Sequence, residues 1–241
     1  MHPPRAHRLR AWLADSLRAH ALRFERPLAP EYADAVGNRM LLAFVAVALG
    51  LFLGLRHLLG AAGAAALPTA RTGFVLILLA AFAGAQRAGV RAPFATVGLH
   101  PWAQWTRRER LYLLQTAPLA ALAFAVVFRA PLLALVAQHG VRGFVLFSLL
   151  TGLAWGMVQE FFYRGWLQTE LTRRFGALRA LLAANLAFTF GPLHADLLAA
   201  GRWGSLAAVF GIGLLFGLLY RRSGNLWIPA LLHGLWPPNM A

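Results

Sequence analysis

The sequence predicts an all-α fold, a polytopic bundle of about seven transmembrane helices of which the last is short. Of the 241 residues, 59% are hydrophobic and 13% are charged, whereas a soluble domain is about 25% charged. The mean hydropathy of +0.60 points the same way. The apolar residues also gather into runs whose lengths match the thickness of a bilayer. These observations place the chain among membrane proteins.

Seven apolar runs are separated by polar or arginine-rich turns, and each is long enough to cross or nearly cross a membrane. They lie at residues 40–55, 73–85, 111–128, 143–163, 178–193, 206–220 and 226–236. The fourth run continues with a polar face to Arg174, so its helix would be ~48 Å long and must tilt, break or emerge along the interface. The seventh stops at Pro237 and Pro238, because proline cannot continue a helix, and its ~18 Å would end at mid-membrane. A short last helix of this kind suggests the wall of a cavity.

The formal net charge of +15 is carried by arginine alone, and most arginines lie at the ends of the apolar runs. The larger share falls on one side, so the positive-inside rule predicts a multi-pass protein of the cytoplasmic (inner) membrane with its amino terminus in the cytoplasm. This charge suits anionic membrane lipids as partners, and the absence of a soluble module with a basic stripe argues against nucleic acid. Residues 1–38 predict an arginine-rich amphipathic segment on the cytoplasmic surface, with a partly disordered tail as the alternative. Residues 39–241 contain no repeat that would indicate a second domain.

Glu160 and Arg164 are ionisable residues inside an apolar run, where charged groups are costly and usually mark the working part of a protein. They lie four residues apart, so they share one face of a helix and can pair. His194 and His233 also lie in apolar sequence. The helical rise counted from the predicted turn near Gly176 places Glu160 and His194 at one depth on two helices. His233, on a third helix, reaches the same depth if the long fourth helix overhangs the membrane by about 10 Å.

This set of side chains permits a narrow range of chemistry. A buried carboxylate beside an imidazole can act as general base toward water, and a second imidazole can donate to an oxyanion. These are the parts needed to hydrolyse an amide bond inside the membrane. Glu160, His194 and His233 can instead hold zinc with one open position. The chain has no cysteine, which excludes thiol nucleophiles and thiolate zinc sites. In a purely structural interpretation, the Glu160–Arg164 pair fastens helices and each histidine bonds a neighbouring helix.

The motifs resemble those of the CPBP intramembrane proteases, which include type II CAAX prenyl endopeptidases and bacteriocin-processing or self-immunity (Abi-type) proteins. The first family motif, Glu-Glu-x-x-x-Arg followed by Gly, corresponds to residues 159–165, and the second, Phe-x-x-x-His, to Phe190 and His194. The third is a histidine followed four residues later by asparagine, and His233 matches its histidine. The lead-in at residues 221–227 also agrees, and the resemblance covers about residues 95–236.

The resemblance implies a helical intramembrane endopeptidase of glutamic type within residues 39–241. On this reading no cofactor is required, although the family is often described as metalloproteases. The family's first glutamate and second-motif histidine would activate water, and its third-motif histidine and asparagine would hold the oxyanion. Two positions depart from that pattern. Gln159 replaces the first glutamate, and Pro237 stands at the asparagine position, with Asn239 two residues later.

We therefore expect an intramembrane endopeptidase that cleaves a peptide bond near the membrane-associated terminus of a protein or peptide substrate. Glu160 is expected to be the general base, His194 its partner, His233 an oxyanion donor and Arg164 the counter-charge, while Gln159 positions water or the scissile carbonyl. One alternative is a catalytically inactive scaffold or immunity homologue, which Gln159 and Pro237 favour. A second is a small-solute transporter, which predicts pseudo-symmetric halves that the sequence does not show. A prenylated CAAX protein, a bacteriocin leader and a C-terminal sorting tag all fit as substrates.

Overall fold

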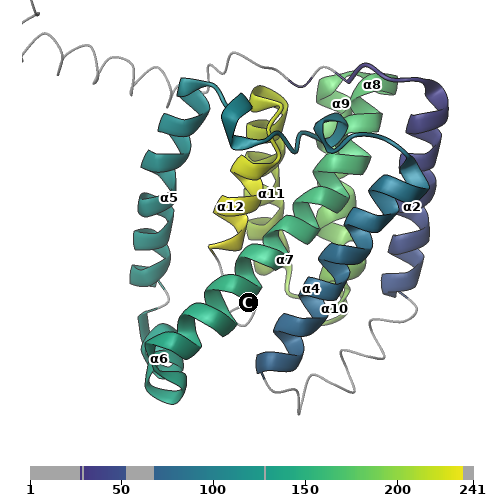
Figure 1. Cartoon of the computed structure of the whole chain (residues 1–241). Helices are drawn as coiled ribbons and strands as arrows, with labels where there is room; N and C mark the ends of the chain where they lie inside the picture. The colour runs from purple at the N-terminus through teal and green to yellow at the C-terminus, as the bar shows by residue number, and fades with distance from the viewer. Residues whose placement is uncertain (1–27, 29, 53–67, 128, 236–241) are drawn as a thin grey trace, which may run out of the picture.

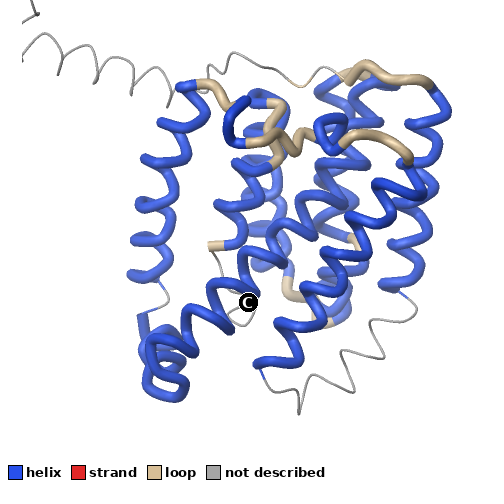
Figure 2. Tube along the Cα trace, viewed as in Figure 1, coloured by secondary structure: helices blue, strands red, loops and turns tan. Residues whose placement is uncertain are grey.

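The structure is a computed structural model that describes residues 28, 30–52, 68–127 and 129–235. Over these residues the chain is helical and contains no strand (Figures 1 and 2). The predicted all-α fold is therefore confirmed. Most of the predicted amino-terminal segment 1–38 lies outside this description, and the first described helix begins at Asp34. Pro237 and Asn239 also lie outside it.

The described elements are α-helices, short 3₁₀ turns and π-helical segments, and they follow the order of the predicted spans. In chain order the elements are α2 (Asp34–Gly50), α4 (Pro68–Gly84), η2 (Ala85–Val90), η3 (Phe94–Val97), η4 (Trp102–Gln104), α5 (Arg107–Val127), α6 (Arg129–Gly143), η5 (Phe144–Leu149), α7 (Leu150–Glu160), η6 (Phe161–Gln168), α8 (Thr169–Phe175), α9 (Ala177–Phe190), η7 (Pro192–His194), α10 (Ala195–Ala199), α11 (Trp203–Ser223) and α12 (Trp227–Gly234).

Three of the described helices are long and apolar enough to cross a membrane: Thr72–Val90, Ala177–Ala199 and Trp203–Ser223. The other predicted spans coincide with α2, α5, the helical path from η5 to α8, and α12. Helix α5 has the surface expected next to lipid. Its outward residues are between 60% and 69% exposed and apolar: Leu114, Leu119, Leu122 and Val126. The chain is therefore a helical membrane bundle.

Arginine-rich helix ends gather at one end of this bundle. The start of α5 carries Arg107, α8 carries Arg173 and Arg174, and α11 ends on Arg221 and Arg222. In Figure 1 the start of α5, helix α8 and the start of α12, which follows α11 directly, all lie at the top. The grouping of arginines that the sequence predicts for one side is thus present in space.

The long fourth span is one helical path from Phe144 to Phe175, and α7 runs obliquely through the bundle in Figure 1. Tilting was one of the three ways in which the sequence allowed this helix to fit. The path begins just after a kink at Gly140, where φ is 66° and ψ is 174°. Two stretches of it, Phe144–Leu149 and Phe161–Gln168, are π-helical. Such segments are frequent at functional sites, and the second one follows Glu160 directly and contains Arg164.

Helix α12 is held against α7 by glycines on both helices. A Cβ atom on Gly156 would lie 2.5 Å from the amide nitrogen of Gly234 and 2.7 Å from the carbonyl oxygen of Ala230. A Cβ atom on Gly234 would lie 2.5 Å from the Cα atom of Leu153. The two backbones therefore touch, as small residues permit in membrane bundles. This contact fixes the position of His233, which immediately precedes Gly234.

A second buried carboxylate, Glu170, ties α8 to the start of α2. It accepts hydrogen bonds from the hydroxyl of Tyr32 at 2.8 Å, from Arg173 at 2.8 and 2.9 Å, and from Arg174. Arg173 also donates to Asp34 at 2.6 Å. Burial alone would raise the pKa of Glu170, but the hydrogen bonds from the two arginines and the tyrosine outweigh it and hold that pKa below its ordinary value.

Replacing Gly156 with alanine is expected to lower the melting temperature of the detergent-solubilised protein by about 5 °C. The added Cβ has no room between α7 and α12, and overpacking of this kind costs roughly 1–3 kcal/mol. Gly211→Ala is the matched control, because nothing lies within 4 Å of a Cβ at Gly211 and alanine is the better helix former. Equal melting temperatures for the two variants would contradict the close contact.

Replacing Glu170 with glutamine is expected to lower the melting temperature at pH 7 by about 5 °C, because two arginines lose their anionic partner at a cost of roughly 2 kcal/mol. A carboxyl group whose pKa is lowered by folding stabilises the protein above the pKa of the unfolded chain, and this contribution disappears as pH falls through the folded value. The difference between wild type and E170Q should therefore shrink from pH 7 toward about pH 3. Glu31→Gln, at an exposed site, is the control. A difference that widens on acidification would refute this role of Glu170.

Candidate active site

Glu160 lies at the junction of α7 and η6 and is completely buried, as is Arg164 at 1% exposure. The Nε atom of Arg164 is 3.3 Å from Oε2 of Glu160, so the predicted pairing of these residues is confirmed. Arg164 also donates from Nη2 to the carbonyl oxygen of Gly213 on α11, at 2.8 Å. Because a buried charge is tolerated only when it is paired and hydrogen-bonded, these contacts fix the arginine between two helices.

The second oxygen of Glu160 is held by His233 on α12. The Nδ1 atom of His233 lies 2.8 Å from Oε1 of Glu160. The imidazole ring stacks on Phe216 of α11, with 5.0 Å between ring centroids. Since a carboxylate only accepts hydrogen bonds, Nδ1 carries a proton in this contact and Nε2 is the ring nitrogen left for other chemistry. The predicted meeting of Glu160 and His233 from two helices is confirmed.

His194 lies at the end of the η7 turn, just beyond α9. Its Nδ1 atom is 2.8 Å from the carbonyl oxygen of Phe188. A carbonyl oxygen also only accepts, so Nδ1 carries the proton and the neutral ring presents a lone pair at Nε2. The sequence suggested that His194 would be the direct partner of Glu160, but the carboxylate is contacted by Arg164 and His233. Helical rise gives the depth of a residue and not the direction of its side chain, which explains the difference.

The ring of Phe188 lies at the centre of this group. Its centroid is 4.9 Å from that of His194 and 5.9 Å from that of His233, both edge-on. The guanidinium of Arg164 lies over the same ring at 4.4 Å, a cation–π contact, and Tyr163 meets it edge-on at 5.3 Å. The two histidines therefore flank one phenyl ring.

The sequence did not single out Phe188. The motif comparison used Phe190, which is 44% exposed at the end of α9. Helical spacing from His194 could not identify Phe188, because the helix ends at Gly191 and Pro192 and the chain turns before it reaches the histidine. The feature of the sequence that could have identified Phe188 is the apolar face of α9, on which Phe188, Ala184 and Leu181 are all buried.

Several polar atoms near this group are buried and have no hydrogen-bond partner among the described residues. They are Gln159 Oε1, Glu160 Oε2, Tyr163 Oη, Arg164 Nη1 and Thr189 Oγ1. The hydroxyl of Tyr163 is next to Gly191, where a Cβ atom would lie 2.9 Å from it. Buried polar groups are normally satisfied by protein or by water, so these atoms mark places where water or a peptide group can bond. Gln159, at 4% exposure, is buried beside Glu160.

The zinc alternative does not fit the arrangement of these side chains. In the described part of the chain, no three histidine, aspartate or glutamate residues are grouped closely enough to hold a metal ion. Glu160 faces the guanidinium of Arg164, and the ring of Phe188 contacts both histidines. A tetrahedral site needs its donors to converge on one point about 2 Å away, which this arrangement does not provide.

Comparison with known protein families matches residues 141–237 to the type II CAAX prenyl endopeptidases, Rce1-like. The match covers 97 of the 241 residues. The resemblance seen in the motifs is confirmed, and this family is one of proteases. The matched segment runs from the end of α6 to beyond α12, so it contains Gln159, Glu160, Arg164, His194 and His233. Neither the curated proteins nor the solved structures give a match.

Glu160→Gln is expected to destabilise the protein by about 3–5 kcal/mol, because it leaves the buried guanidinium of Arg164 without its counter-charge. The double variant E160Q/R164M, which removes both charges, should recover much of that loss. Thermal unfolding in detergent measures both variants, with Glu31→Gln as the control at an exposed site. If the double variant were less stable than E160Q, the Glu160–Arg164 pair would not be the contact that matters.

Proposed function

We propose that the protein is an intramembrane endopeptidase that hydrolyses a peptide bond near the membrane-associated terminus of a protein or peptide substrate. The observation that carries this proposal is the contact of the buried Glu160 carboxylate with His233, in the first motif of a protease domain. His194 presents a second imidazole across the ring of Phe188. We also propose that the arginine-rich end of the bundle faces the cytoplasm, because positive charge accumulates on that side of membrane proteins.

His194 is the general base in this mechanism. Its Nδ1 proton is used by the carbonyl oxygen of Phe188, so Nε2 is the atom that accepts a proton from the attacking water. The water oxygen then bonds to the scissile carbonyl carbon. When the tetrahedral intermediate collapses, the carbon–nitrogen bond breaks and His194 returns the proton to the leaving amine. The sequence suggested Glu160 for the first step; we assign it to His194 because Oε1 of Glu160 is bonded to His233 and Oε2 lies 3.3 Å from the guanidinium of Arg164.

Glu160 acts through His233. When His233 is protonated, Nδ1 donates to Glu160 and Nε2–H is left to donate to the developing oxyanion. Arg164 lies on the other side of the carboxylate, with Nε 3.3 Å from Oε2. The unpartnered Oε1 atom of Gln159 accepts a hydrogen bond from the attacking water. This route uses side chains of the chain alone.

The same contacts also support one other function, that of an inactive scaffold. Gln159 cannot take up a proton, and the neighbouring carboxylate is already paired with Arg164 and His233. A scaffold would keep its cellular role when His194 and His233 are replaced. An enzyme would not.

The expected outcome in reconstituted vesicles is cleavage of a fluorescence-quenched, farnesylated CAAX peptide by the full chain. Replacing His194 or His233 with alanine should lower the rate by 10²-fold or more, the usual contribution of a proton-transfer or oxyanion group. His139→Ala, on α6 and away from the group, should have the wild-type rate.

A second readout does not depend on the choice of peptide. Membrane proteins from a deletion strain carrying wild type, H194A or H139A are compared for new carboxyl- and amino-terminal peptides. Identical profiles for wild type and H194A, in cells with equal amounts of folded protein, would favour the scaffold.

A further inference from the structure

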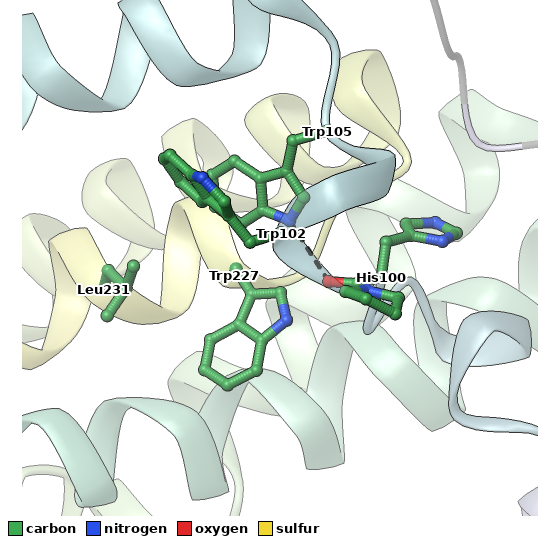
Figure 3. Close-up of a pocket in the computed structure, with 6 residues that line it drawn as sticks. His100, Trp102, Trp105, Trp227 and Leu231 are labelled. Atoms are coloured by element: carbon green, nitrogen blue, oxygen red, sulfur yellow. Dashed lines mark hydrogen bonds between the residues drawn. The ribbon is translucent and has the colours of Figure 1, made fainter.

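A pocket of about 260 Å³ lies at the arginine-rich end of the bundle, away from Glu160. Its lining is almost entirely aromatic or apolar: His100, Pro101, Trp102, Trp105, Trp227 and Leu231. In Figure 3 the indoles of Trp102 and Trp105 lie on one side and that of Trp227 on the other, with Leu231 and His100 at the two ends. Three of the chain's eight tryptophans therefore line one small hollow.

The lining is held in place by hydrogen bonds that do not depend on a ligand. The indole of Trp105 donates to the carbonyl oxygen of His100 at 3.1 Å, as drawn in Figure 3. The ring of His100 lies 3.1 Å from the carbonyl oxygen of Gly224, which ties the loop to the start of α12. Trp102 and Trp105 are in contact, with centroids 4.7 Å apart. The pocket is thus a preformed feature of the loop before α5 and the first turns of α12.

The pocket is on the outer face of α12. Trp227 and Leu231 are four residues apart and share that face, whereas His233 turns inward to Glu160. Trp227 is 36% exposed and Trp102 is 52% exposed, so large apolar rings stand open at its mouth. A substrate bound at Glu160 would not need this hollow.

Its level in the membrane follows from the neighbouring helix. Helix α5 begins at Arg107, directly after the loop, and its lipid-facing side begins at Leu114, which is 64% exposed. Tryptophan is enriched where headgroups meet hydrocarbon, because its ring is apolar and its N–H is polar. The pocket is therefore next to the point at which the exposed apolar face of α5 begins.

A cationic side chain contacts two of the tryptophans that line the pocket. Arg110 lies over the ring of Trp102, with its guanidinium carbon 5.6 Å from the centroid. It donates to the carbonyl oxygen of Trp105 from Nε at 3.1 Å and from Nη2 at 2.7 Å. A guanidinium has five N–H groups, so three remain to bind an anion such as a phosphate. An occupant with a cationic headgroup would meet this positive charge, whereas an anionic one is attracted by it.

We propose that this pocket is a binding site for one anionic glycerophospholipid. The proximal methylene groups of one acyl chain lie between the indoles of Trp102 and Trp227 and reach Leu231. The phosphate lies against Arg110. The combination of an apolar hollow, tryptophan at its mouth and arginine at its rim matches the three parts of such a lipid in the same order.

The test uses the full chain in nanodiscs with equal amounts of phosphatidylglycerol and phosphatidylcholine, followed by native mass spectrometry of the released protein. Wild type is expected to retain one phosphatidylglycerol molecule. The variant W102A/W227A should lose it, and R110Q should reduce the preference for phosphatidylglycerol over phosphatidylcholine by about five-fold. Trp203→Ala is the matched control, because Trp203 is also exposed, at 64%, but starts α11. It should retain the lipid as wild type does.

A second measurement keeps the wild-type pocket intact. Fluorine NMR of protein labelled with 5-fluorotryptophan should show the Trp102 and Trp227 signals shifting as phosphatidylglycerol is added to phosphatidylcholine nanodiscs, while the Trp203 signal stays. The proposal is overturned if wild type retains no stoichiometric lipid, if both lipids are retained equally, or if W203A loses lipid as W102A/W227A does. Displacement of the phosphatidylglycerol by a farnesylated peptide at equal concentration would also overturn it, since the pocket would then belong to the substrate.

Discussion

The arrangement of this bundle depends on one constraint, the complete burial of the Glu160 carboxyl group. A carboxylate at that depth is tolerated only with close partners. Those of Glu160 are Arg164, from the same helical path, and His233, from α12. Arg164 is held in turn by the carbonyl oxygen of Gly213 on α11. The helices must therefore approach closely. Gly156 and Gly234 allow this between α7 and α12, and Gly213 allows it between α11 and α9, where a Cβ would lie 2.8 Å from the ring of Phe188. The glycines thus permit the close helix contacts that the buried Glu160–Arg164 pair requires.

The same local pattern occurs twice on the fourth helical path, with different outcomes. Glu160 is followed four residues later by Arg164, and Glu170 four residues later by Arg174. The second pair lies at the arginine-rich end and is bonded by Tyr32 and Arg173, so it fastens α8 to the start of α2. The first pair meets an imidazole whose other nitrogen is unused. What separates a structural pair from a candidate catalytic one is the chemistry of the third partner, which lies on a distant part of the chain.

The sequence predicted the helical bundle, a fourth helix too long to cross the membrane upright, the Glu160–Arg164 pair and the meeting of Glu160 with His233, because these follow from hydropathy, helix length and helical spacing. It did not predict the position of His194. The chain leaves helical geometry at Gly191 and Pro192. The number of residues along the helix therefore does not predict which way the His194 side chain points after that turn. For the same reason, spacing along the chain did not indicate that Phe188 is the phenylalanine whose ring contacts His194. The family motif had matched Phe190. The π-helical stretch Phe161–Gln168 was also beyond prediction, since it depends on packing between helices.

Gln159 is consistent with the proposed division of roles. Glu160 and Arg164 together carry no net charge, and both are almost completely buried. A second carboxylate at position 159 would leave the site with an uncompensated negative charge, which the apolar surroundings disfavour. The neutral amide avoids this cost but also removes a proton acceptor. The remaining group able to take a proton from water is then an imidazole with a free lone pair, and the hydrogen bond from Nδ1 of His194 to Phe188 leaves that lone pair on Nε2. In the proposed mechanism, the glutamine at this position leaves the proton transfer to His194 and not to a carboxylate.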